Sequence, residues 1–69
     1  MSPGTALLVN AVMNNMIQDV PSVFNKYTVE TVYEKIVEVC RNDSCGSTDG
    51  ANVSMLTNKV LNKLYNPNG

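Results

Sequence analysis

Apolar residues recur at helical spacing in three segments of the chain. In the first segment they return every three or four positions, while asparagine, glutamine and aspartate fill the opposite side. The apolar positions are Val9, Val12, Met13, Met16 and Val20. Thr5 is a candidate N-cap, and Pro21 disfavours helical geometry at the residue before it. The pattern therefore predicts a helix over residues 5–20.

The second segment begins after Thr28, another candidate N-cap. Its apolar stripe contains Val29, Val32, Tyr33, Ile36, Val39 and Cys40. The β-branched residues in this stripe would also suit a strand. The strict alternation of a half-buried strand fails, however, where Val32 and Tyr33 are adjacent. The spacing favours a helix over residues 28–41.

The third segment has its stripe at Val53, Leu56, Val60, Leu61 and Leu64. Asn52 or Ser54 can cap its start, and Asn66 followed by Pro67 ends it, which predicts a helix over residues 53–65. Together the three segments predict a small all-α domain, residues 1–69, built as a three-helix bundle. A polar loop of about 12 residues separates the second and third helices, against two to eight in most bundles.

A chain of 69 residues forms one domain at most and buries only about 60% of its unfolded surface, so its stability is marginal without help. The net charge of −1 creates no strong field toward nucleic acid or membrane. The charge is uneven along the chain. Residues 1–49 carry six acids and three bases, which gives −3, whereas residues 50–69 carry two lysines and no acid, which gives +2.

The residue types exclude most catalysis. The chain has no histidine, and so lacks the commonest general base and the commonest metal ligand. Glu30, Glu34 and Glu38 are four residues apart, so on a helix they share one environment, whereas paired catalytic carboxylates need different ones. No glycine pattern matches a phosphate-binding loop. We expect no enzyme activity, no metal and no cofactor.

Both cysteines, Cys40 and Cys45, lie where the second predicted helix passes into the polar loop. A calcium loop that starts at Asp43 would need glycine at its sixth position and glutamate at its twelfth, but Thr48 and Ser54 stand there. A zinc site would need about four ligands, mostly cysteine and histidine, and this chain has two cysteines and no histidine. Because Cys40 completes an apolar stripe, the favoured interpretation is a buried thiol there and an exposed thiol at Cys45. A disulfide between them stays open, since a short loop could satisfy its geometry.

The N-terminal segment lacks the basic start and unbroken apolar core of a signal peptide, and no run approaches the ~18 apolar residues of a membrane span. We expect a cytoplasmic protein without membrane contact if the chain is complete. Ten residues are asparagine, which is typical of an AT-rich genome such as that of a virus, phage or plasmid.

The third segment resembles the recognition helix of helix-turn-helix repressors. The resemblance covers about ten residues and rests on Val53, Ser54, Thr57, Val60, Leu61 and Asn62. It departs from that family upstream, because such units join their helices by three or four residues. The resemblance implies DNA binding, with five side chains near the duplex: Ser54, Thr57, Asn58, Lys59 and Lys63. This is the alternative hypothesis, and five basic residues would neutralise few phosphates.

The leading hypothesis is a non-enzymatic protein-interaction module that forms a homodimer. The first predicted helix has more apolar residues than one buried stripe needs, and methionines adapt well to binding surfaces. The predicted interface consists of Leu7, Leu8, Met13, Met16 and Ile17. The second predicted helix carries an acidic ridge formed by Glu30, Glu34 and Glu38. This ridge could also face Lys59 and Lys63 of a second copy across a two-fold axis.

Overall fold

A computed structural model of the chain describes residues 1–42 and 47–68, and these residues form helices and turns without a strand. The helices are α1 (Pro3–Asp19), α2 (Val23–Lys26), α3 (Val29–Asn42) and α4 (Gly50–Tyr65). The prediction of a small all-α bundle is confirmed. A single turn, α2, lies between the first two long helices and was not part of the prediction.

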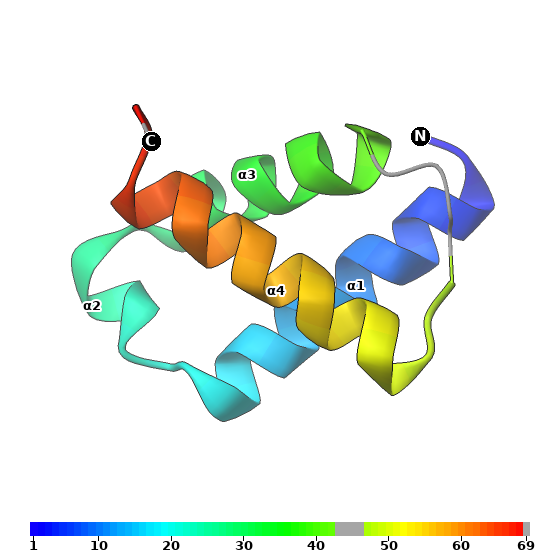
Figure 1. Cartoon of the computed structure of the whole chain (residues 1–69), viewed down its shortest axis with the longest axis horizontal. Coiled ribbons are helices and arrows are strands. Elements are labelled where there is room, and N and C mark those ends of the chain that lie inside the picture. Colours follow the sequence, from blue (N-terminus) through cyan, green and yellow to red (C-terminus); the bar gives the residue numbers. More distant parts are fainter. Residues whose placement is uncertain (43–46, 69) are drawn as a thin grey trace.

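The three long helices pack against one another, so that each contacts the other two. In Figure 1, α4 crosses in front of α1, while α3 runs along the upper side of the molecule and α2 closes the left end. The bundle measures 29 × 26 × 21 Å along its principal axes. The start of α1 and the end of α4 lie toward opposite ends of the long axis (Figure 1).

The first two long helices start at side-chain caps. Ser2 caps α1, because its hydroxyl accepts a hydrogen bond of 3.2 Å from the backbone N–H of Thr5, and Pro3 occupies the first turn, where its missing N–H costs nothing. The helix therefore begins two residues before the expected start at Thr5. Thr28 caps α3 as predicted: its hydroxyl accepts from the N–H of Thr31 at 3.1 Å.

The fourth helix begins three residues earlier than expected. Its N-cap is Asp49, whose carboxylate accepts a hydrogen bond from the N–H of Asn52 at 3.0 Å and another from the hydroxyl of Ser47 at 2.8 Å. Seven positions, rather than about 12, consequently separate the last residue of α3, Asn42, from the first residue of α4, Gly50. That length is ordinary for adjacent helices of a bundle.

Asp49 makes the stability of α4 sensitive to acid. The N–H of Asn52, and next the Ser47 hydroxyl, hold the pKa of Asp49 below its ordinary value of 3.8. A folded pKa below the unfolded one gives stability that is complete above the unfolded value and lost as pH falls through the folded value. Asp49→Ala should therefore destabilise the protein near neutral pH, and its deficit should shrink below about pH 4.

Thermal unfolding followed by circular dichroism from neutral pH down to about pH 2 measures this deficit. Asp49→Asn is the matched control, because it keeps a capping oxygen but carries no ionisable group. The difference between Asp49→Asn and Asp49→Ala should stay constant over the same range. If the difference in stability between the wild type and Asp49→Ala did not change with pH, the negative charge of Asp49 would have no role in capping α4.

Among the described residues, the core contains thirteen buried apolar side chains, and none of them is aromatic. They are Leu8, Val9, Val12, Met16, Val23, Val32, Ile36, Val39, Cys40, Val53, Leu56, Val60 and Leu64. Seven of the thirteen are valine, so the core is made mainly of small, branched side chains. Phe24 and Tyr27 are partly buried and pack against this core.

Candidate functional site

The predicted interface on α1 is divided between the core and the surface. Leu8 and Met16 are buried, with 1% and 0% of their surface exposed, and Met13 is half-buried. Leu8 and Met16 are therefore a correction to the predicted interface, because a buried side chain offers nothing to a partner, whereas Met13 keeps part of its surface exposed. The reason is that α1 contacts both α3 and α4, so it buries a wider face than one stripe.

The two remaining residues of that interface are exposed but separated. Leu7 and Ile17 have 65% and 53% of their surface exposed. They lie on one ridge of α1, at helical spacing with Asn10 and Asn14 between them, and both asparagines are exposed. Polar side chains therefore interrupt the apolar surface of α1 midway.

A more continuous apolar surface lies on α3. Val29, Tyr33 and Val37 are spaced four residues apart, which places them in one row along the helix. Val29 is 62% exposed and Tyr33 42%, whereas Val37 is half-buried against the core. We call these three residues the α3 row. Sequence reasoning assigned Val29 and Tyr33 to the buried stripe, and the structure places both on the surface.

Each residue of the α3 row is followed in the sequence by a glutamate, and the three glutamates differ in their surroundings. Glu30 and Glu34 are exposed, and neither makes a hydrogen bond or ion pair with another described residue. Glu38 pairs with Lys35, with 3.0 Å between Nζ and Oε2. The hydrogen bond from Lys35 and then its charge lower the pKa of Glu38, and the charge of Lys63 adds to the effect. Of these three acids, Glu38 alone is paired with another described residue.

The residues implied in DNA contact lie on α4, and one of them faces inward. Thr57 is buried, with 5% of its surface exposed. Its hydroxyl lies 2.7 Å from Oδ1 of Asn15 on α1 and 2.9 Å from the carbonyl oxygen of Val53. The single hydroxyl proton serves one acceptor at a time. Thr57 therefore ties α4 to α1 and is removed from the set of possible base contacts.

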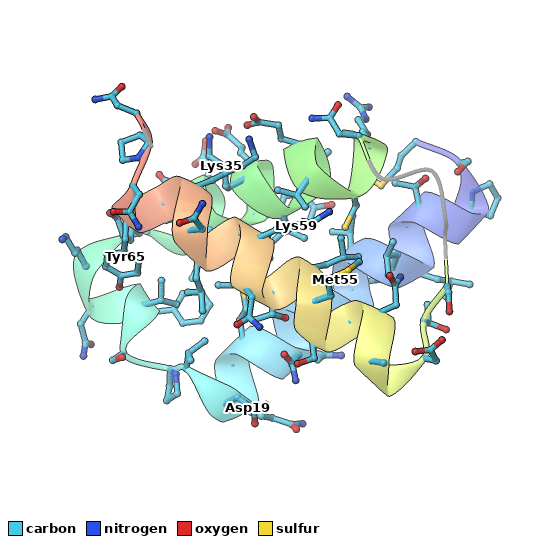
Figure 2. The ribbon with its side chains drawn as sticks, in the orientation of Figure 1. Asp19, Lys35, Met55, Lys59 and Tyr65 are labelled. Carbon is cyan, nitrogen blue, oxygen red and sulfur yellow. The ribbon has the colours of Figure 1, made fainter. Side chains whose placement is uncertain are left out.

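The other four residues of that set are exposed. They are Ser54, Asn58, Lys59 and Lys63. Figure 2 shows Met55 and Lys59 along the front of α4, with Tyr65 at its end. No acidic residue occurs within Gly50–Tyr65, so this helix is positive, although Lys63 lies within the electrostatic influence of Glu38 on α3.

An aromatic cluster joins the end of α4 to the segment before α3. The hydroxyl of Tyr27 donates a 2.7 Å hydrogen bond to the carbonyl oxygen of Leu64, one of the last-turn carbonyls that lack a partner inside the helix. The rings of Tyr27 and Tyr65 meet edge to face, 5.5 Å apart and at 80°. The ammonium group of Lys26 lies 5.0 Å from the Tyr65 ring centroid. The cluster fixes the C-terminus of α4.

The described residues form no pocket, and they contain no group of three or more histidine, cysteine, aspartate or glutamate side chains that could hold a metal ion. Cys40 is buried, as the favoured interpretation expected. Cys45, and with it the possible disulfide, lies outside the described residues. Among the described residues, no helix is both long and apolar enough to cross a membrane.

The chain matches no family model, no curated protein and no solved structure.

Proposed function

We propose that the chain is a non-enzymatic protein-interaction module and that the α3 row is its docking surface. The observation that supports this proposal is the exposure of Val29 and Tyr33 beside the half-buried Val37 on a helix whose adjacent face is in the core. Single apolar side chains on a surface are ordinary. Apolar side chains in a continuous group mark places where other molecules bind.

The partner that can be tested with this chain alone is a second copy, which keeps the predicted homodimer and moves its interface from α1 to α3. Two α3 helices packed antiparallel about a two-fold axis would place the Tyr33 rings near the axis and Val29 opposite Val37 of the second copy. A stable interface buries about 1,200 to 2,000 Å² in total. The whole chain exposes only 4263 Å², and one helical row is a small part of it, so we expect weak association.

Sedimentation equilibrium at increasing concentration should show a mass above that of the monomer at high micromolar concentration. The double substitution Val29→Ser and Tyr33→Ser should weaken association by about tenfold, because it removes the apolar area that the dimer buries. Val29 is 62% and Tyr33 42% exposed, and neither belongs to the buried core, so the fold should survive the change.

Leu7→Ser together with Ile17→Ser is the matched control, since it removes exposed apolar surface from α1 instead. This variant should associate like the wild type. If it alone became monomeric, the interface would lie on α1. A wild-type chain that remains a monomer at millimolar concentration would refute self-association.

Duplex DNA binding is the weaker candidate. Thr57 faces α1, and Lys63 lies close enough to Glu38 to lower its pKa, so the charge on α4 is partly compensated within the chain. With five basic residues in all, few phosphates could be neutralised.

A further inference from the structure

We infer that the α3 row favours a partner segment that is apolar and basic, in the form of an amphipathic helix, over a second copy of this chain. This inference rests on the proposed function, because it takes the α3 row as the docking surface. It adds the chemistry of the preferred occupant, which follows from the charges beside the row.

Two uncompensated carboxylates lie next to the row. Glu30 follows Val29 and Glu34 follows Tyr33, so each acid lies about 100° further around the same helix. Both are exposed and unpaired among the described residues, in contrast to Glu38, which has Lys35 and the charge of Lys63. The N-terminal half of the row is therefore both the most apolar and the most negative part of the α3 surface.

The stability of α3 accounts for the position of only one of these two acids, Glu30. Glu30 lies in the first turn of α3, where the helix dipole favours a negative charge. Glu34 lies a full turn further on, and its spacing of four residues from Glu30 is unfavourable for like charges. The pair has no counterion in the described part of this chain, and a partner could supply one.

The same acids act against a second copy. In an antiparallel α3 pair the acidic side of one helix faces the acidic side of the other, so Glu30 and Glu34 of the two copies repel. A partner helix with lysine or arginine beside its apolar side reverses the sign of that interaction. Such a helix also fits the row in shape, because apolar residues at successive turns match one another along two packed helices.

One double variant, measured in two assays, tests the inference. The variant should change the affinity in opposite directions in the two assays. Glu30→Gln with Glu34→Gln should strengthen self-association in sedimentation equilibrium, by about twofold or more, because the repulsion is gone. The same variant should weaken binding of a basic probe. The probe is a synthetic amphipathic helix with a leucine side flanked by lysines, and its twin carries glutamates in place of the lysines.

Fluorescence anisotropy should show that the wild-type chain binds the lysine probe about fivefold more tightly than the glutamate twin at low salt, and that high salt removes the preference. The variant Glu30→Gln with Glu34→Gln should bring the ratio close to one. Equal binding of the two probes to the wild type, or the same direction of change in both assays, would overturn the inference.

The variant Val29→Ser with Tyr33→Ser separates this inference from the function beneath it. It should weaken binding of both probes, since it removes the apolar row and leaves the acids. If it weakens both while the two probes bind the wild type equally, the row is the docking surface and the charge preference is wrong. If it changes neither, the row is not the docking surface and the proposed function fails with it.

Discussion

Leu8→Ala should cost about 2 to 5 kcal/mol of the free energy of unfolding, while Leu7→Ala at the next position should change it by less than about 0.5 kcal/mol. The two residues have the same side chain, the same helix and adjacent places in the sequence. They differ in surroundings, since Leu8 is buried in the core and Leu7 is exposed. Removing three carbons at Leu8 leaves a cavity in a core of small side chains.

Urea denaturation followed by circular dichroism measures both values. A 69-residue domain has a total stability of roughly 3 to 10 kcal/mol, so Leu8→Ala could be partly unfolded before any denaturant is added. In that case its transition would lack a folded baseline, which is itself the expected direction. If the two alanine variants lost the same free energy of unfolding, the buried position of Leu8 would be contradicted. Leu8 would then again be a candidate residue of the predicted α1 interface.

Tyr27→Ala should cost about 2 kcal/mol, and Tyr27→Phe about 1 kcal/mol. The alanine variant loses the ring contact with Tyr65, the packing of the Tyr27 ring against the core, and the hydrogen bond to the Leu64 carbonyl oxygen. The phenylalanine variant loses only the hydrogen bond. The ratio of the two losses therefore separates the capping of α4 from the packing at its end.

Tyr33→Ala is the matched control, because Tyr33 is another tyrosine near the start of α3 but faces outward. Its expected cost is below about 0.5 kcal/mol. Thermal unfolding of the three variants and the wild type in one buffer provides the comparison. If Tyr33→Ala cost as much as Tyr27→Ala, the cluster at the end of α4 would have no special structural role.

The sequence predicted the long helices because their apolar residues repeat with the period of a helix. It placed the start of α4 too late, because Asp49 lies in a run of polar residues where several could serve as a cap. The cap is chosen by the hydrogen bonds that Asn52 and Ser47 make with it, and those depend on the folded loop. The turn α2 was missed because four residues are too few to show a helical period.

The candidate surface was harder to predict than the fold. A stripe indicates which side of a helix faces the core, but not how far the neighbouring helices extend along it or how many there are. Val29 belongs to the stripe of α3 and is nevertheless exposed. Leu8 lies off the narrow stripe of α1 and is nevertheless buried, because two helices cover α1. Asking which stripe residues lie at a helix end would have found Val29, but not Tyr33, which lies in the second turn, or Val37, which is outside the stripe.

The valine-rich core has a consequence for how this chain folds. Valine loses little rotamer entropy on burial, so a core of this composition retains much of its hydrophobic gain. Valine also disfavours an isolated helix, and α3 has four valines and an isoleucine among its 14 residues. A helix of that length and composition does not persist alone in water. Helix formation and core packing therefore depend on each other, so the chain gains or loses both in one cooperative step.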